Sequence, residues 1–156
     1  MLPVEDVQSY PRPPLCEPVP HEVVARFAGT EIYRGTDALR VCETHHAPTY
    51  YLPIDALPAG LLTPVPGRSF CEWKGVAAYF DLTWSGQSAA RAAWTYPQLS
   101  ARFAQLKDHV AIYAHALDRA SVGGLVVTPQ PGDFYGGWVT ENLTGIVKGG
   151  PGTEGW

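Results

Sequence analysis

The sequence predicts a mainly β domain with one or two short helices, folded into a small tent-like or barrel-like antiparallel sheet. Short segments rich in β-branched and aromatic residues recur along the chain, which is typical of strands. The 16 Gly and 15 Pro exceed the average usage of about 7% and 5%, which favours turns over long helices. Only residues 99–110 repeat apolar side chains at helical spacing. A chain of 156 residues fits one compact domain with a substantial core.

The proline-rich and glycine-rich stretches suggest three parts. Residues 1–20, with "SYPRPP" and "EPVP", form an extended proline-rich arm that lies over the domain and that Tyr10 anchors. Residues 21–128 form a single β-rich domain. Residues 129–156 form a Gly-rich C-terminal extension that packs on the same domain, along its surface or at a sheet edge.

The first strands are expected directly after the arm. "EVVARFAG" and "EIYRG" form a hairpin with a turn at Gly29 and Thr30. "ALRVCETHH" alternates next, which puts Leu39, Val41, Glu43 and His45 on one face of a strand and Arg40, Cys42 and Thr44 on the other. Glu43 thereby continues an apolar stripe.

The strongest local signal is a second hairpin. "TYYLP" is a short strand whose two tyrosines face opposite ways, and a Pro-rich connection follows it. "KGVAAYFDLTW" and "QSAARAAWTY" then flank a two-residue Ser85-Gly86 turn. A regular ladder from this turn pairs Trp84 with Gln87, Ala77 with Trp94 and Tyr79 with Ala92. One face then carries an aromatic wall with small residues between the rings: Trp73, Gly75, Ala77, Tyr79, Ala92, Trp94 and Tyr96.

A helix and further strands complete the domain. Leu99, Phe103, Leu106 and Val110 recur at helical spacing in "LSARFAQLKDHV", with Ser100 as the N-cap. "AIYAHAL" and "GGLVVTP" return to strand.

Composition excludes several functional classes. The 11 Lys and Arg against 15 Asp and Glu give a net charge of −4 without a basic run, so we expect no nucleic-acid partner. The sequence has neither a signal peptide nor an apolar stretch long enough to cross a membrane, which predicts a soluble, cytoplasmic protein, monomer or homodimer. Three widely spaced cysteines, Cys16, Cys42 and Cys71, are expected to be reduced thiols.

"CEWKG" places a thiol and charged side chains in a strand whose other residues predict burial in the interior. A buried Lys74 needs a counter-ion, and Glu43 is the natural candidate. Such a pair beside aromatic walls would hold an anionic or carbonyl group of an unknown small molecule, or act as acid and base. In a regular strand Cys71 and Lys74 face opposite ways, so Gly75 would have to bend the chain for both to enter one pocket. Alternatively, Lys74 and Glu43 form an ion pair that binds no ligand, or the Lys74 side chain extends its ammonium group to solvent.

The remaining motifs are less specific. Cys71 is a candidate nucleophile if a neighbouring cation stabilises its thiolate, and otherwise a small core residue. "CETHH" holds four potential metal ligands, but strand alternation divides them and no CxxC or HExxH motif is present, so neither a metal nor a cofactor is assigned.

The order and spacing of "ETHHAPTYYLP", "CEWKGVAAYF", "AAWTYP" and "AIYAHAL" resemble the domain-of-unknown-function 427 family over residues 21–117. The resemblance implies a small β-rich, tent-like or barrel-like domain of Mss4-like shape. The family is also labelled nucleotidyltransferase-like, but the paired acidic residues of that chemistry are not found in this sequence, and neither are the CxxC pairs that hold zinc in Mss4-like relatives. It implies no established reaction for the residues at its motif positions, which are Glu43, His45, Pro48, Tyr51, Pro53, Cys71, Trp73, Lys74, Gly75, Tyr79, Trp94, Tyr96 and Pro97.

The leading hypothesis is therefore a small-molecule site between the "CETHH" and "CEWKG" strands. Its candidate catalytic residues are Glu43, Lys74 and Cys71, and its candidate ligand-binding residues are His45, Tyr51, Trp73, Tyr79 and Trp94. The alternatives are a non-catalytic protein-interaction module, which predicts a large exposed apolar patch, and thiol redox chemistry at Cys71.

Overall fold

The computed structural model describes residues 2–71, 74–132, 135–150 and 153, and confirms a mainly β fold. The largest sheet has seven strands, and every neighbouring pair is antiparallel. In spatial order these strands are β2 (Leu15–Pro18), β5 (Leu39–Cys42), β6 (Thr49–Pro53), β10 (His109–Ile112), β9 (Gln87–Leu99), β8 (Gly75–Trp84) and β7 (Leu62–Cys71).

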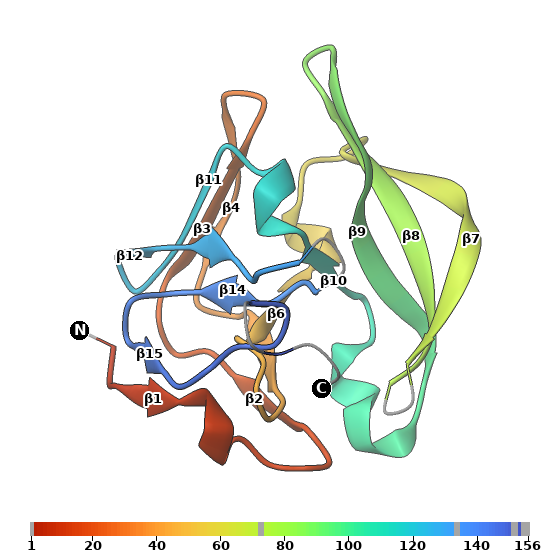
Figure 1. Ribbon diagram of the computed structural model, residues 1–156. Helices are drawn as coiled ribbons and strands as arrows, with labels where there is room; N and C mark the ends of the chain where they lie inside the picture. The colour runs from red at the N-terminus through yellow and green to blue at the C-terminus, as the bar shows by residue number, and fades with distance from the viewer. Residues whose placement is uncertain (1, 72–73, 133–134, 151–152, 154–156) are drawn as a thin grey trace.

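A four-stranded antiparallel sheet lies beside it (Figure 1), in the order β12 (Leu125–Val126), β11 (Arg119–Val122), β3 (Val23–Phe27) and β4 (Thr30–Gly35). Two short ladders involve the chain ends. β1 (Glu5–Asp6) pairs in parallel with β15 (Leu143–Thr144), and β13 (Thr128–Pro129) pairs with β14 (Trp138–Val139).

The large sheet is open rather than closed into a barrel. Its two edge strands are β2 and β7, and these do not pair with each other within the described residues. Of the two predicted shapes, the barrel-like one is therefore wrong. β2 comes from the proline-rich arm, so the arm supplies an edge strand of the main sheet in addition to lying over it.

The seven-stranded sheet carries an apolar core on each face. β6 shows the alternation directly, because Tyr50 and Leu52 belong to a larger core shared with the four-stranded sheet, whereas Tyr51 belongs to a smaller core on the other face. The opposite orientations predicted for the paired tyrosines are thus confirmed. The smaller core consists of Val41, Tyr51, Ala77, Trp94, Tyr96, Phe103, Leu106 and Ala111.

The predicted hairpins form, but the turn of the first one lies at Ala28-Gly29 because Thr30 pairs with Phe27, and the register of the second one shifts. Trp84 pairs with Gln87 around Ser85-Gly86 as predicted, whereas an irregularity between Leu82 and Phe80 places Tyr79 opposite Trp94. The predicted pairs of Ala77 with Trp94 and of Tyr79 with Ala92 are therefore wrong. The register shift is caused by a bulge beside Arg91, which the alternation of side chains in the sequence does not reveal.

Arg91 has a φ of +48°, and its N–H donates to the Asp81 carboxylate at 2.7 Å. Ala90, Arg91 and Ala92 of β9 here lie opposite the single residue Asp81 of β8, and this irregularity rotates the following part of the strand. As a consequence Ala92 belongs to the larger core, and not to the aromatic face on which it was predicted.

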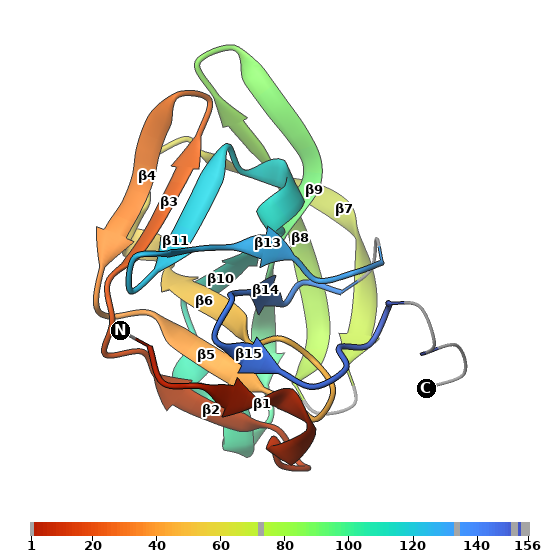
Figure 2. The same ribbon diagram turned by 60° about the vertical axis from the view of Figure 1, so that its left-hand side comes forward.

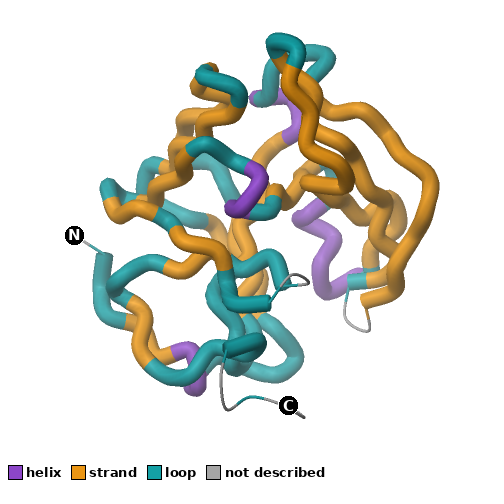
Figure 3. Tube along the Cα trace, turned by 45° about the horizontal axis from the view of Figure 1, so that its top comes forward, coloured by secondary structure: helices purple, strands orange, loops and turns teal. Residues whose placement is uncertain are grey.

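The prediction of a helix over residues 99–110 is also wrong. The structure has a 3₁₀ segment, η3 (Ala101–Leu106), in which Phe103 departs from helical geometry, and Val110 lies in β10. Ser100 precedes η3 as predicted, but its side chain makes no capping hydrogen bond there. The apolar spacing instead reflects two buried side chains, Phe103 and Leu106, followed by a strand. The other helical segments are the three-residue 3₁₀ turns η1 (Val7–Ser9), η2 (Ile54–Ala56) and η4 (Ala114–Ala116), as Figure 3 shows.

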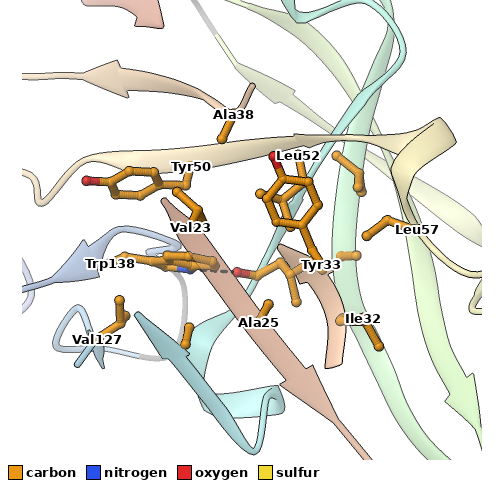
Figure 4. Packing of buried hydrophobic residues seen from close by; sticks show 14 of the residues in the cluster. Val23, Ala25, Ile32, Tyr33, Ala38, Tyr50, Leu52, Leu57, Val127 and Trp138 are labelled. Atoms are coloured by element: carbon orange, nitrogen blue, oxygen red, sulfur yellow. Dashed lines mark hydrogen bonds between the residues drawn. The ribbon is translucent and has the colours of Figure 1, made fainter. Parts of the chain in front are cut away.

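The C-terminal extension does more than run along the surface. Trp138 is 1% exposed and belongs to the larger core, where its ring stacks on Tyr50 with centroids 5.2 Å apart (Figure 4). Its indole N–H donates to the Ile112 carbonyl at 2.9 Å. The extension then continues past β14 to β15 beside the N-terminal arm (Figure 2). In the part of the chain that the structure covers, no helix has the length and apolar character needed to cross a bilayer.

Candidate functional site

The site is built around Lys74, which directly precedes β8. Gly75 begins that strand with a φ of +112°, and a side chain there would place its Cβ 2.7 Å from the Gln98 carbonyl oxygen. The close approach of β9 thus requires glycine at this position. Lys74 itself is 8% exposed, and its Nζ lies 5.7 Å from the centroid of the Tyr96 ring. The backbone carries an ammonium group into the interior at the edge of the smaller core.

Glu43 does not serve as the predicted counter-ion. The salt bridges in the described residues all involve Arg34 or Arg40, and none joins Lys74 to Glu43. The reason is local, because β5 ends at Cys42 and leaves Glu43 outside the sheet. The strand alternation that was predicted to put Glu43 on an apolar stripe therefore ends at Cys42, one residue before Glu43.

Residues 43–46 form a turn instead of continuing the strand. The His46 N–H donates to the Glu43 carbonyl at 3.0 Å, and His45 has a φ of +67°. The turn is fixed from both ends of the chain, because the His45 N–H donates to the Val7 carbonyl at 3.0 Å and the Lys148 N–H donates to the His45 carbonyl at 2.6 Å. The predicted placement of His45 on the Leu39 face of a strand is wrong for this reason.

The aromatic wall is largely present. Tyr51 and Trp94 are 1% and 7% exposed and share the smaller core, and the rings of Tyr51 and Tyr96 lie 6.5 Å apart. Trp94 also contacts Tyr113, with ring centroids 4.6 Å apart. The structure therefore brings Lys74, Tyr51 and Trp94 to one region, together with the rings of Tyr96 and Tyr113.

Tyr79 is half-buried at the other end of this wall. The Arg91 guanidinium lies 4.1 Å from its ring centroid, and its hydroxyl is 2.5 Å from the Ser69 hydroxyl. Trp73 and the Cys71 side chain lie outside the described residues. The roles predicted for them stay predictions.

Sequence reasoning did not select His46, which lies in the same turn as Glu43 and His45. Its ring meets the Tyr135 ring edge-on, with centroids 5.2 Å apart. Burial, and after it the positive charges of Lys148, Lys74 and Arg12, together lower the pKa of His46 to about 4. The charges of these three residues thus oppose protonation of the imidazole.

Gln130 fixes the orientation of that imidazole. The Gln130 side chain is 2% exposed, and its Oε1 accepts the Ala47 N–H at 3.1 Å. Its Nε2 must then supply both remaining bonds, to the Lys148 carbonyl at 2.9 Å and to Nδ1 of His46 at 3.1 Å. Because the amide can only donate there, Nδ1 of His46 accepts and the imidazole proton sits on Nε2. No local sequence signal could have found a contact that spans 84 positions.

A second feature lies under the N-terminal arm. Glu5 and Glu17 both bind the guanidinium of Arg40, at 2.8 Å and 2.9 Å. Burial alone would raise the pKa of Glu5, but the hydrogen bonds from Arg40 and Tyr10 outweigh it and lower that pKa. These groups line a cavity of about 220 Å³ beside Tyr50. Since Tyr50 and Tyr51 face opposite sides of the sheet, this cavity is separate from the Lys74 region.

The comparison with protein families matches residues 15–123 to the family described as Domain of unknown function (DUF427). The chain belongs to the DUF427 family. The matched region contains Glu43, His46, Lys74 and Trp94, but it ends before Gln130 and Lys148. A search of curated proteins finds no match to the chain.

Two of the three thiols of this DUF427 protein are poorly suited to nucleophilic chemistry. Burial raises the pKa of Cys16 to about 11, although the charge of Lys74 opposes this, and burial raises the pKa of Cys42 to about 12. At neutral pH both are protonated, and a thiol attacks as the thiolate. Within the described residues, no group of three His, Cys, Asp or Glu side chains is placed to hold a metal ion.

Proposed function

We propose that this DUF427 domain binds a small molecule through an anionic or carbonyl oxygen at Lys74. Tyr51, Trp94 and Tyr79 form apolar walls of the site, with Trp73 as a further wall. Glu43, which is half-buried and forms no ion pair with a described residue, is the group of the site that can exchange a proton with the ligand.

The observation that carries this proposal is the burial of Lys74 without an ion pair in the described part of the chain. Removing an ammonium group from water is unfavourable unless hydrogen bonds and an opposite charge replace the lost hydration. The ring of Tyr96 at 5.7 Å supplies only part of this, since a cation–π contact contributes on the order of 1–2 kcal/mol. A ligand oxygen would supply the rest.

The alternative, a protein-interaction module, has less support. Such a module needs a contiguous apolar patch on its surface. The large apolar side chains that are exposed in the described residues come from separate parts of the chain: Val4, Leu15, Val76, Val126 and Ile146.

The experiment compares wild type with Lys74→Met and Lys107→Met by mass spectrometry under native and then denaturing conditions. Methionine keeps the unbranched stem and removes the charge, and a hydrophobic replacement of a buried charge is often neutral or stabilising. We expect a retained mass in wild type that disappears on unfolding, persists in the control at exposed Lys107, and is lost in Lys74→Met.

Weak ligands need a second readout, which is the NMR signal of the Lys74 side chain during titration with acetate and with sulfate. The proposal would be overturned by a wild type that carries no bound mass and whose Lys74 signal responds to neither anion. Equal retention of the ligand in Lys74→Met would overturn it as well.

A further inference from the structure

We propose that the cavity under the N-terminal arm is a second binding site, and that it takes a small organic cation, an ammonium group on a short apolar tail. The ammonium group binds the carboxylate of Glu17, and the tail lies against the apolar wall of the cavity. This site is independent of the Lys74 region, because the cavity adjoins Tyr50 of the larger core, whereas Lys74 lies beside Tyr96 of the smaller core. It also selects the opposite charge.

The first step of the argument is the size and character of the cavity. Its volume is about 220 Å³, and an apolar cavity of about 150 Å³ is already enough for benzene. Most of the wall consists of Leu, Val and Pro side chains, among them Leu2, Val19 and Val122. Charged groups gather at one part of the wall, where Glu5 and Glu17 meet Arg40. An apolar cavity with a few convergent polar groups has the character of a small-molecule site.

The second step is that backbone hydrogen bonds hold the walls in place. The Val19 N–H donates to the Ala38 carbonyl at 3.0 Å, which fixes the end of β2. On the other side, the Glu5 N–H donates to the Asn142 carbonyl at 3.0 Å, and the Asn142 side-chain amide donates to the Pro3 carbonyl at 2.9 Å. The arm is thus bound both to the main domain and to the C-terminal extension. The cavity is therefore a built part of the fold.

The third step is the charge at the polar part of the wall. All three guanidinium nitrogens of Arg40 donate to Glu5 or Glu17, at 2.8 to 3.1 Å, so this cation is already neutralised by the protein. Burial raises the pKa of Glu5, but the hydrogen bonds from Arg40 and Tyr10 outweigh it and lower that pKa. Apart from His21, whose charge varies with pH, two carboxylates thus face one guanidinium. The excess negative charge attracts a cation and repels an anion.

Glu17 is the carboxylate that has room for the ammonium group. Both oxygens of Glu5 are occupied, Oε1 by Arg40 and Tyr10 and Oε2 by Arg40. In Glu17, Oε1 accepts both hydrogen bonds from Arg40, and Oε2 accepts none from the described residues. A ligand can therefore bind Oε2 of Glu17 without breaking the ion pair that holds the arm.

The test uses the full-length protein at about pH 8, above the range in which histidine ordinarily titrates, with butylammonium as the probe. Butyrate has a similar tail and the opposite charge, and methylammonium has the charge without the tail. ¹³C NMR follows the methyl signals of Val122 in the cavity wall, with those of exposed Val126 on the neighbouring strand as the reference.

The variant is Glu17→Gln, which keeps the size of the side chain and an acceptor for Arg40 but removes the charge. Glu31→Gln is the matched control, because Glu31 is also a strand carboxylate paired with an arginine but does not line the cavity.

We expect butylammonium to shift the Val122 signals in a saturable way and to leave those of Val126 unchanged. Glu17→Gln should weaken binding about tenfold, as the loss of a hydrogen bond to a charged group does, whereas Glu31→Gln should not. Methylammonium and butyrate should each bind at least about tenfold more weakly than butylammonium, because the first buries fewer methylene groups and the second is repelled.

Three results would each overturn the inference. They are butyrate binding as tight as butylammonium binding, an unchanged affinity in Glu17→Gln, and parallel shifts of the Val122 and Val126 signals. A wild type without saturable binding of butylammonium up to roughly 50 mM, where little binding free energy remains, overturns it as well. If Glu17→Gln proves unstable in urea unfolding, the wild-type preference for butylammonium over butyrate decides, because it depends on no variant.

Discussion

At the scale of single residues, Arg40 and His46 are two partly buried basic groups whose surroundings differ in charge. Arg40 has two carboxylate partners, Glu5 and Glu17, which together fix the arm to the sheet. His46 has the opposite surroundings, with positive charges around a buried ring and an amide that donates to it. Its environment therefore opposes protonation, and folding stability must depend on pH.

This dependence has a definite sign. Folding lowers the pKa of His46 to about 4 from its ordinary value of about 6.5. Below about pH 6.5 the unfolded chain binds a proton at His46, whereas the folded chain does not. The contribution of His46 to the free energy of unfolding is therefore complete above that pH and is lost as the pH falls toward 4. At about 1.4 kcal/mol per pKa unit, we expect wild type to lose on the order of 3 kcal/mol over this range.

Urea unfolding at a series of pH values measures the effect. His46→Asn should flatten the curve between about pH 6.5 and 4, because the titrating group is gone. A His46→Asn curve parallel to wild type would contradict the assigned charge state.

At the scale of elements, two features of the β8–β9 hairpin shape the candidate site. One is its bulge at Arg91, and the other is its contact with the C-terminal segment. The bulge at Arg91 aligns Tyr79 with Trp94, and Gly136 of the C-terminal segment then lies directly against the Trp94 ring. A Cβ at Gly136 would be 2.1 Å from the nearest ring carbon of Trp94. Neither partner can easily yield, since Trp94 is 7% exposed and packs against Tyr113.

Gly136→Ala should therefore destabilise the protein by about 2 kcal/mol, which is typical of overpacking a close contact. Gly150→Ala is the matched control, because a Cβ there would meet its nearest neighbour at 3.5 Å, an ordinary contact. Denaturant unfolding followed by tryptophan fluorescence reports both variants. Equal stabilities for the two would show that the segment does not press on Trp94.

At the scale of the whole molecule, the C-terminal segment is part of the folded core. Trp138 closes the larger core by stacking on Tyr50 and bonding to Ile112 from a position beyond the family-matched region. The core is thus shared between residues that the family pattern covers and residues that it does not.

Trp138→Ala should cost about 3–5 kcal/mol, as is usual for a large buried aromatic side chain. Trp138→Phe should cost less, because it keeps an aromatic ring on Tyr50 and loses chiefly the N–H bond to Ile112, at roughly 1 kcal/mol. Thermal and urea unfolding of both variants measure the difference. A loss below about 1 kcal/mol for the alanine variant would mean that the segment merely covers a core that is complete without it.

The β class, both hairpins, the opposite orientations of Tyr50 and Tyr51 and the family could be predicted from the sequence, because they depend on periods of two residues and on turn chemistry within a few positions. Only the tertiary structure decided the end of β5 at Cys42, the register opposite Trp94 and the partnership of His46 with Gln130. A bulge shifts every later pair without altering the apolar pattern. A hydrogen bond between positions 84 apart leaves no periodic trace at all.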